Sequence, residues 1–376
     1  MRRALERIEI PGEHEARERA WAVVSAAFAE REPRPRSRPF LRPLIALAVL
    51  AAVAGAALSP PGRAVIDDIR EAIGVERARP ALFSLPADGR LLVTSARGAW
   101  IVQPDGSKRL LGRYREASWS PLGLFVAAAR RNELVALDPK GSLRWSLPRP
   151  DVRGPRWAPS GYRIAYLTGR NLNVVAGDGT GDKAFADGVH PVAPAWRPGR
   201  AHVLALSDRD GRIHVFATDR KVLNGRSARG EPPIQLAWSP SGRRLLVLSH
   251  RSLRVLDSRG RLLRGMAAPP GAVNVAAAWR GESFALVRRL ERSGESELVL
   301  VRRGRARRIF AGSGRFTDVV WSPDGRWLVL GWRDADQWLF IRSAGVHEIE
   351  AVSAISAQFR SAAFPSLRGW CCAVSP

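Results

Sequence analysis

The chain has 376 residues, 45% of them hydrophobic, and its 60 lysine and arginine residues outnumber 35 acidic ones, for a formal net charge of +25. This length and apolar content are enough to bury a substantial core, which excludes an intrinsically disordered protein. The 34 glycines and 27 prolines are typical of a turn-rich β protein. Only two cysteines are present, which excludes a framework of several disulfides.

Residues 1–42 are polar and charged, and an amphipathic helix is expected within them over residues 13–31. Ala20, Val24 and Phe28 recur there at helical spacing. Two interpretations stay open: a docking helix for a cytosolic partner, or a small helix that lies on the membrane surface or in solvent.

The segment Pro43–Gly62 contains no charged residue, and Leu44–Leu58 within it is an unbroken apolar run. As a helix, a segment of this length spans roughly 30 Å, the thickness of a bilayer core. Arg38 and Arg42 lie before it and only Arg63 lies close behind, so the N-terminus is expected in the cytoplasm. We predict a single-pass anchor in a bacterial cell membrane. A buried helix and a cleaved signal peptide are the alternatives, and the long charged region ahead of the apolar run argues against the second.

Residues 63–79 are expected to form a juxtamembrane helix and linker. Ile66, Ile69 and Ile73 recur on one side of such a helix, and Asp67 favours its first turn electrostatically. This segment is expected to pack against the following domain or the membrane surface.

Residues 80–376 repeat a unit of about forty residues, a period typical of repeat architectures. The clearest copy is the sequence Trp-Ser-Pro-Asp-Gly at residues 321–325, and residues 83–90 are a copy without its tryptophan. The recurring tryptophans are Trp119, Trp157, Trp196, Trp238, Trp279 and Trp321, separated by 38, 39, 42, 41 and 42 residues.

Two short apolar runs follow each of these corners, and a weaker run leads into the next tryptophan. Short runs rich in Val, Ile and Leu predict buried strands, and Asp-and-Gly turns often end the second run. The first runs are 91–94, 124–129, 163–168, 203–207, 245–249, 284–288 and 327–332. The second runs are 99–102, 134–137, 172–175, 213–217, 253–256, 298–301 and 338–341.

About four strands per unit predict an all-β fold, a β-propeller of seven four-stranded blades, with six or eight blades as alternatives. The tail Phe359–Cys372 offers one or two further strands, including Ala363–Pro365 and Trp370–Ala373. We expect these C-terminal strands to return to the first blade and close the ring, because closure removes free strand edges. The tryptophans are interpreted as wedges between blades.

The repeated corners, each followed by an apolar strand, resemble the TolB-type, WD-repeat-like β-propeller repeats over residues 80–376. Only the copy at 321–325 carries the aspartate, Asp324, whereas the others have Leu122, Ser160 or Ser241 there. The resemblance implies a fold used for protein binding and as an accessory to enzymes, so it indicates architecture rather than activity.

The positive charge comes almost entirely from arginine, because only four of the 60 basic residues are lysine. The arginines are spread over the turns of every repeat, without one clustered face, so no nucleic-acid partner is expected. Anionic lipid headgroups and acidic cell-wall polymers are better candidates for a basic surface outside the membrane. Coding bias of the source is the alternative explanation.

Cys371 and Cys372 are adjacent in the last predicted strand. Neighbouring residues of a strand point to opposite faces, so we expect two small apolar side chains packed separately. A vicinal disulfide, or a redox sensor, is the alternative.

No catalytic, cofactor or metal site is expected. The six histidines are scattered without metal-ligand spacing, and there is no Gly-x-Ser-x-Gly elbow and no phosphate-binding glycine loop. The turn Arg333–Trp338 places Asp334 and Asp336 two residues apart beside aromatic residues. It is interpreted either as a site for a cation or a partner, or as a solvated hairpin with an Arg–Asp pair.

The leading hypothesis is a monomeric, non-enzymatic propeller outside the cell membrane that binds a protein or an anionic envelope component. The cytosolic segment 1–42 would then relay the bound state to a cytosolic partner. A propeller hydrolase or lyase acting on a cell-envelope polymer is the alternative. An intracellular nucleic-acid binder is a third hypothesis, which the predicted anchor disfavours.

Overall fold

The computed structural model describes residues 81–199, 201–343 and 348–372. The elements predicted within residues 1–79, including the membrane segment at 43–62, lie outside these residues. Among the described residues, the single helix is α4 (Ile355–Gln358), and no helix there combines the length and apolar character that crossing a bilayer requires.

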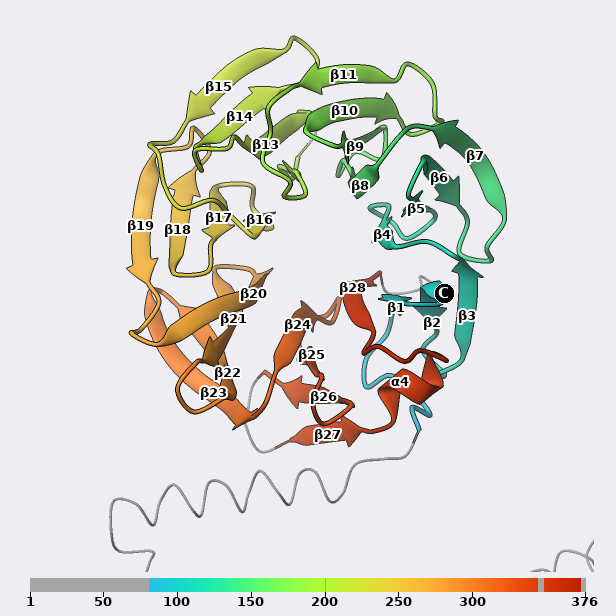
Figure 1. The fold of residues 1–376 in the computed structure, drawn as a ribbon, viewed down its shortest axis with the longest axis vertical. Helices are drawn as coiled ribbons and strands as arrows, with labels where there is room; N and C mark the ends of the chain where they lie inside the picture. The colour runs from blue at the N-terminus through green and yellow to red at the C-terminus, as the bar shows by residue number, and fades with distance from the viewer. Residues whose placement is uncertain (1–80, 200, 344–347, 373–376) are drawn as a thin grey trace, which may run out of the picture. The chain divides into compact units, whose positions relative to one another are not determined.

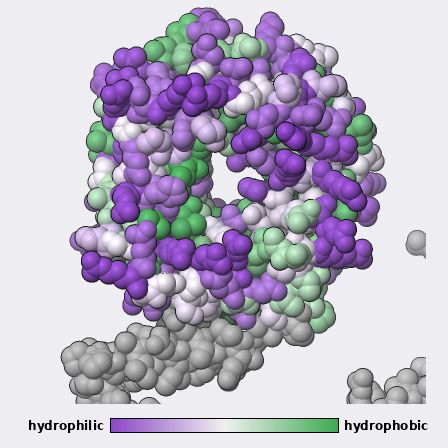
Figure 2. Space-filling model, in the orientation of Figure 1, coloured by the Kyte–Doolittle hydropathy of each residue, from purple (hydrophilic) through white to green (hydrophobic). Residues whose placement is uncertain are grey.

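The described residues form seven antiparallel four-stranded sheets around a central opening (Figures 1 and 2). This confirms the predicted all-β propeller of seven four-stranded blades. We number the blades in chain order. Blade 1 is β28 with β1–β3, and blades 2 to 7 are β4–β7, β8–β11, β12–β15, β16–β19, β20–β23 and β24–β27.

Each blade runs from an inner strand beside the opening to an outer strand at the rim. The inner strands are β28 (Ser366–Cys371), β4 (Glu116–Trp119), β8 (Val152–Trp157), β12 (Ala195–Trp196), β16 (Gln235–Trp238), β20 (Ala272–Arg280) and β24 (Phe316–Trp321). The second strands are β1 (Arg90–Ser95), β5 (Val126–Arg130), β9 (Arg163–Thr168), β13 (Val203–Ser207), β17 (Arg244–Leu248), β21 (Ser283–Leu290) and β25 (Trp327–Trp332). The third strands are β2 (Gly98–Val102), β6 (Glu133–Leu137), β10 (Asn171–Ala176), β14 (Ile213–Ala217), β18 (Ser252–Asp257), β22 (Glu295–Arg302) and β26 (Gln337–Arg342). The outer strands are β3 (Lys108–Gly112), β7 (Leu143–Pro148), β11 (Lys183–Ala186), β15 (Val222–Arg226), β19 (Leu262–Ala267), β23 (Arg305–Ser313) and β27 (Ile349–Val352).

The second and third strands are the apolar runs predicted from the sequence. The strands β9, β13, β14 and β25 have the predicted bounds. Both faces of these strands pack against neighbouring blades, which explains continuous apolar runs instead of alternation. The outer strands differ, since most side chains of β7 and β19 are exposed and give no apolar signal in the sequence.

Each Trp-x-Pro-x-Gly corner turns the chain from an inner strand into a second strand. In the copy before β25, the N–H of Gly325 donates to the carbonyl of Ser322 (2.9 Å), and Gly325 has a φ of +67° that favours glycine. The carboxylate of Asp324 accepts hydrogen bonds from Ser322 Oγ (2.6 Å) and from Arg326 N (2.9 Å). Although partial burial opposes its ionisation, these hydrogen bonds lower the pKa of Asp324 to about 2.

The two ends of the described chain meet in blade 1, as predicted (Figure 1). The C-terminal strand β28 pairs antiparallel with β1 as the inner strand of that blade. Trp370 therefore supplies the tryptophan missing from the copy at residues 83–90, so one corner is assembled from both chain ends. The tail contributes one strand only: Ala363–Pro365, expected within a strand, is irregular and follows α4.

Candidate functional site

The recurring tryptophans link neighbouring blades, which supports their interpretation as wedges. Four indole N–H groups donate to a backbone carbonyl of the preceding blade: Trp196 to Arg156 (2.9 Å), Trp238 to Ala195 (3.0 Å), Trp279 to Ala237 (2.9 Å) and Trp321 to Ala278 (3.0 Å). The indole nitrogens of Trp119, Trp157 and Trp370 are buried without a hydrogen-bond partner in the described structure. The hydrogen-bonded series is thus incomplete around the closing blade.

The turn at Arg333–Trp338 is explained by structural contacts. Asp334 binds the guanidinium of Arg315 (2.7 Å) and not that of its neighbour in sequence. Asp336 accepts hydrogen bonds from the backbone N–H (2.8 Å) and the hydroxyl (2.7 Å) of Ser356, at the start of α4. Both carboxylates therefore have protein partners, which favours the hairpin interpretation over a cation site.

Three side chains from blades 3 and 4 form a hydrogen-bonded line that the sequence did not reveal. Ser160 Oγ lies 2.9 Å from His202 Nε2, and His202 Nδ1 lies 3.0 Å from the carboxylate of Asp219. In the neutral imidazole, an N–H at Nδ1 leaves Nε2 to accept the serine proton, as a nucleophile–base pair requires. Asp219 is 51% exposed, and Arg163 lies 2.5 Å from the same carboxylate.

Ser160, His202 and Asp219 do not form a recognisable sequence motif, because they lie in turns of two different repeats. Only the geometry of the blade interface shows the line. No three histidine, cysteine or acidic side chains of residues 81–199, 201–343 and 348–372 are grouped to hold a metal ion.

A groove of about 870 Å³ lies between blades 5 and 6, and we call it the blade 5/6 groove. Its apolar lining comes from several strands of both blades. These residues are Val255, Leu263, Met266, Trp279, Phe284 and Val301. Trp279 and Phe284 meet edge to face, with ring centroids 5.2 Å apart. Leu263 is 56% exposed, so part of the apolar surface is open to solvent.

The charged lining of the blade 5/6 groove is mainly basic. Arg244, Arg264 and Arg303 line it, whereas Glu282 is its one acidic residue and pairs with Arg244 at 2.7 Å. In the described structure, the guanidinium groups of Arg264 and Arg303 have neither an ion pair nor a hydrogen bond. A positive rim around an apolar floor can bind an anionic partner that also carries apolar groups.

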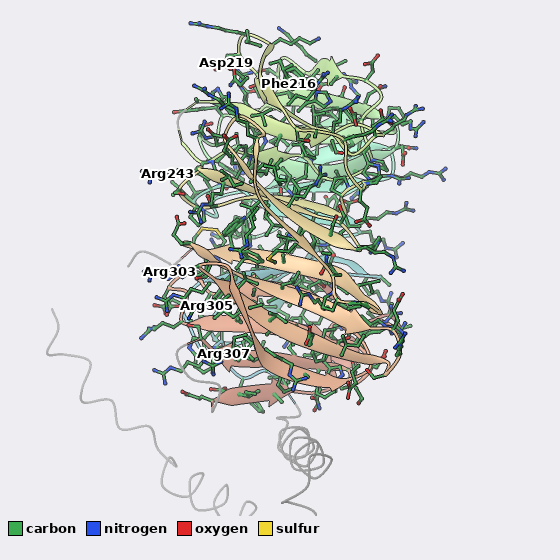
Figure 3. The ribbon with its side chains drawn as sticks, turned by 90° about the vertical axis from the view of Figure 1, so that its left-hand side faces the viewer. Phe216, Asp219, Arg243, Arg303, Arg305 and Arg307 are labelled. Carbon is green, nitrogen blue, oxygen red and sulfur yellow. A yellow bond between two sulfur atoms is a disulfide. The ribbon has the colours of Figure 1, made fainter. Side chains whose placement is uncertain are left out.

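A cluster of arginines extends this positive surface along blade 6. Five arginines occur among residues 302–308, at the turn between β22 and β23 and at the start of β23. Figure 3 shows Arg303, Arg305 and Arg307 on the same side of the ring as Arg243 of blade 5. The arginines are otherwise spread over the repeats, as expected, and this run is a local concentration at one blade. The run itself was the sequence signal for it.

The equivalent groove between blades 2 and 3 is aromatic and not basic. It measures about 840 Å³. Trp145 is the structural equivalent of Arg264, because each lies on the outer strand of its blade and pairs with the third strand, Trp145 with Ala136 and Arg264 with Val255. The indole N–H of Trp145 donates to Gly177 O (2.8 Å), and the lining residue Arg144 pairs with Asp138 (3.0 Å). The two grooves thus have similar volumes but different linings, basic in one and aromatic in the other. The groove between blades 2 and 3 therefore serves as a control for the blade 5/6 groove.

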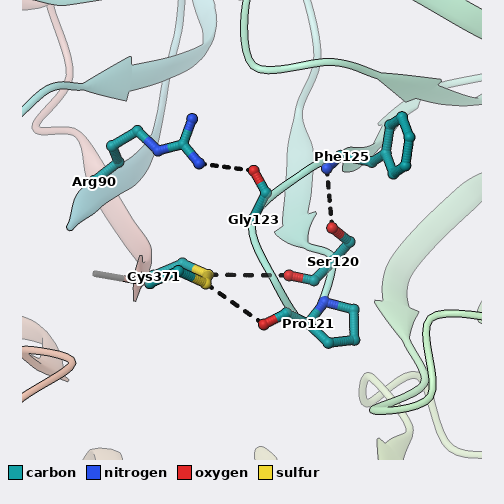
Figure 4. The surroundings of a disulfide bond; sticks show 7 residues. Arg90, Ser120, Pro121, Gly123, Phe125 and Cys371 are labelled. Carbon is teal, nitrogen blue, oxygen red and sulfur yellow. Dashed lines mark hydrogen bonds between the residues drawn. A yellow bond between two sulfur atoms is a disulfide. The ribbon is translucent and has the colours of Figure 1, made fainter. Parts of the chain in front are cut away.

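Cys371 and Cys372 are joined by a disulfide, so the expectation of two separately packed thiols is wrong. The strand ends at Cys371, and Cys372 has a φ of +58°, which removes the alternation that would place the sulfurs on opposite faces. The two sulfurs contact the carbonyls of Ser120 (3.9 Å) and Pro121 (3.4 Å) in the blade 2 corner (Figure 4). The disulfide therefore sits where the last strand meets blade 2.

No family model matches the sequence, and no curated protein matches it. Solved structures do share its fold. The WD40 domain of Sif2 has a TM-score of 0.53 at 13% identity and covers 73% of this chain and 88% of its own. The Cps50 (Swd1) propeller of Myceliophteria thermophila has a TM-score of 0.51 at 12% identity, covering 64% and 86%. Kuenenia stuttgartiensis hydrazine synthase has a TM-score of 0.53 at 14% identity, covering 60% and 75%. At these identities the likeness shows a WD40-type propeller fold and leaves function to the surface chemistry.

Proposed function

We propose that this chain is a binding scaffold on the outer surface of a bacterial cell membrane. It holds an acidic segment of a partner protein in the blade 5/6 groove. The observation that carries this proposal is the combination of a partly exposed apolar floor with two unpaired arginines, Arg264 and Arg303, at the rim. The predicted anchor at residues 43–62 supports the location, and residues 1–42 would relay the bound state to a cytosolic partner. The scaffold acts as a monomer and has no nucleic-acid partner.

The groove sets the kind of segment it accepts. About 870 Å³ has room for only a few side chains, so the ligand is a short segment and not a folded surface. Leucine or aromatic side chains would cover the floor at roughly 25 cal/mol per Å² of apolar area buried. Aspartate or glutamate at the edges would pair with the arginines, and the net charge of +25 would accelerate encounter at low salt.

Charge reversal at the rim tests the proposal. The probe is a short fluorescent peptide in which glutamate alternates with leucine and phenylalanine, and its binding to the full chain is followed by anisotropy. Replacing Arg264 and Arg303 by glutamate exchanges two attractions of about 0.2–1 kcal/mol each for repulsions of similar size. The summed change of about 1–4 kcal/mol weakens binding about fivefold or more.

The matched control is the double variant Lys140→Glu/Arg144→Glu at blade 2, which changes the net charge equally. We expect the control to weaken peptide binding less than about threefold, because its groove is not basic. Equal loss in both double variants would mean that the peptide responds only to total charge. Absence of saturable binding to the unaltered chain would also contradict the proposal.

The location is tested by reporter fusions in bacterial cells. A C-terminal fusion to an enzyme that works only outside the cytoplasm should be active, and the same fusion should lose activity when residues 43–62 are deleted. Activity of a cytoplasmic reporter at the C-terminus would contradict the proposed orientation.

A second candidate function, hydrolysis, is favoured by the Ser160–His202–Asp219 line. In that reaction Ser160 Oγ attacks an ester carbonyl while His202 takes its proton and then protonates the leaving alcohol, and water releases the acyl group. Binding is preferred because Asp219 is half exposed and its charge already pairs with Arg163. Covalent labelling by a fluorophosphonate that Ser160→Ala and His202→Gln both abolish would favour the hydrolase.

A further inference from the structure

A cavity of about 510 Å³ lies beside the central opening, where β28 closes the ring. Four successive blades contribute to its wall, through Pro323, Trp370, Trp119 and Arg156. Figure 1 shows β28, β4 and β8, which carry the last three residues, following one another around the opening and away from β19 and β20. This closure cavity is therefore separate from the blade 5/6 groove.

Two arginines from different blades are the only charged side chains in the wall of the closure cavity. Arg368 of β28 uses Nε to donate to Thr94 Oγ1 (2.7 Å), and Arg156 of β8 uses Nη1 to donate to the carbonyl of Pro155 (3.0 Å). Neither guanidinium forms an ion pair within the described residues. Burial lowers the pKa of Arg156 and the charge of Arg368 lowers it further, whereas the charge of Glu116 raises it. The two cations are therefore close enough to repel each other, with a carboxylate nearby.

The nearest carboxylates serve the blade interfaces and lie outside the cavity wall. Glu116 accepts the backbone N–H of Gly154 in blade 3 (2.7 Å), and Asp318 accepts that of Leu367 in blade 1 (3.1 Å). Burial raises the pKa of Asp318, while the charge of Arg368 and the hydrogen bond from Leu367 lower it. The charge of Glu116 raises the pKa of Arg156, so the carboxylates balance part of the positive charge. Neither carboxylate forms a direct ion pair with the two guanidinium groups, which keep unused hydrogen-bond donors.

The same wall has an excess of hydrogen-bond donors. Trp119 Nε1, Trp370 Nε1 and Ser118 Oγ are buried just behind it, and none of them has a partner in the described structure. An unmade hydrogen bond of a buried group costs about 1–3 kcal/mol, so a bound acceptor would stabilise this region. The equivalent indoles of blades 4 to 7 already donate to protein carbonyls.

We propose that the closure cavity binds a phosphate group. Guanidinium groups from β8 and β28 approach from different blades, which suits the several oxygens of a tetrahedral dianion better than one planar carboxylate. The indole and hydroxyl donors behind the wall supply further hydrogen bonds after small side-chain movements. Because the arginines belong to blades 1 and 3 with blade 2 between them, a bound phosphate joins the closing blade to its neighbours and stabilises the closed ring.

The experiment measures phosphate binding to the full chain by calorimetry and by thermal unfolding. Inorganic phosphate is the first probe and glycerol 3-phosphate the second. We expect saturable binding that raises the unfolding midpoint, and about tenfold weaker binding in Arg156→Gln and in Arg368→Gln. Tighter binding of glycerol 3-phosphate would show that the natural ligand carries its phosphate on a larger molecule, whereas equal binding would indicate free phosphate.

Arg144→Gln in the groove between blades 2 and 3 is the matched control and should leave phosphate binding unchanged, because Arg144 pairs with Asp138 and belongs to neither proposed site. The closure cavity shares no lining residue with the blade 5/6 groove, so this test is independent of the proposed function. Arg368→Gln removes the hydrogen bond to Thr94, so circular dichroism must show that it is folded. If it is not, Trp119→Phe takes its place and should weaken binding several-fold. The proposal is overturned if the unaltered chain binds neither probe saturably, or if Arg156→Gln and Arg144→Gln weaken phosphate binding equally.

Discussion

Replacing Trp238 by phenylalanine should destabilise the propeller more than the same replacement at Trp157. The two indoles occupy the same position in their repeats and are almost equally buried, with 7% and 9% of their surface exposed. Trp238 Nε1 donates to the carbonyl of Ala195 (3.0 Å), whereas Trp157 Nε1 has no partner among the described residues. The loss of apolar contact is similar in both variants, so their difference reports the interblade hydrogen bond.

A net hydrogen bond contributes about 0.5–1.5 kcal/mol, and a buried carbonyl left without its donor adds to the loss. We therefore expect Trp238→Phe to lose about 1–2 kcal/mol more than Trp157→Phe. Urea unfolding gives the free energy of unfolding of both variants. It is followed by far-ultraviolet circular dichroism, because each variant has lost one tryptophan and fluorescence is no longer comparable. Equal losses, or a greater loss in Trp157→Phe, would refute the reasoning that the series of indole bonds stabilises the ring.

Three further predictions concern ring closure and the corners. Trp370→Ala should lower the free energy of unfolding by about 3–5 kcal/mol, measured by thermal unfolding, because it leaves a cavity at a buried site. Its control, Leu122→Ala, removes a side chain that is 73% exposed and should change the free energy of unfolding by no more than about 0.5 kcal/mol. Reducing the Cys371–Cys372 disulfide should lower the free energy of unfolding by only about 1 kcal/mol, because the disulfide closes a very short loop. A loss several times larger, measured by urea unfolding with and without reductant, would contradict this. The lowered pKa of Asp324, about 2, means that it stabilises the fold above its ordinary pKa and that this stability is lost as the pH falls toward 2. Asp324→Asn should therefore show a smaller drop in unfolding midpoint between pH 4 and pH 2 than the unaltered chain, and an equal drop would contradict the assignment.

Ring architecture could be predicted from this sequence because its signals are local and repeated. The corner at residues 321–325 needs proline and glycine for its turn, and β25 after it is apolar because it is buried on both faces. Outer strands such as β7 gave no signal, because their exposed side chains follow no apolar pattern. Trp370 was not recognised as the seventh tryptophan, because the rest of its corner lies at the other end of the repeat region.

The candidate sites were harder to predict, because each depends on which blades are neighbours. Arg264 and Arg303 are 39 residues apart and meet only through the packing of blade 5 on blade 6. Ser160 and His202 lie in different repeats, and Arg156 meets Arg368 only after the chain has come full circle. Contacts of this kind follow from three-dimensional closure, and no short motif encodes them.

Blade 1 cannot be completed during synthesis until its inner strand, β28, has been made, because β28 pairs with β1. The inner edge of β1 is finished when Ser95 has been made, yet its partner ends 276 residues later at Cys371. At 5–20 residues per second, that interval lasts about 14 to 55 seconds, during which the backbone groups of this edge are open to foreign strands. A polypeptide truncated before residue 366 lacks β28, so the edge of β1 stays unpaired. That exposed edge distinguishes the truncated polypeptide from the closed propeller for proteases and chaperones.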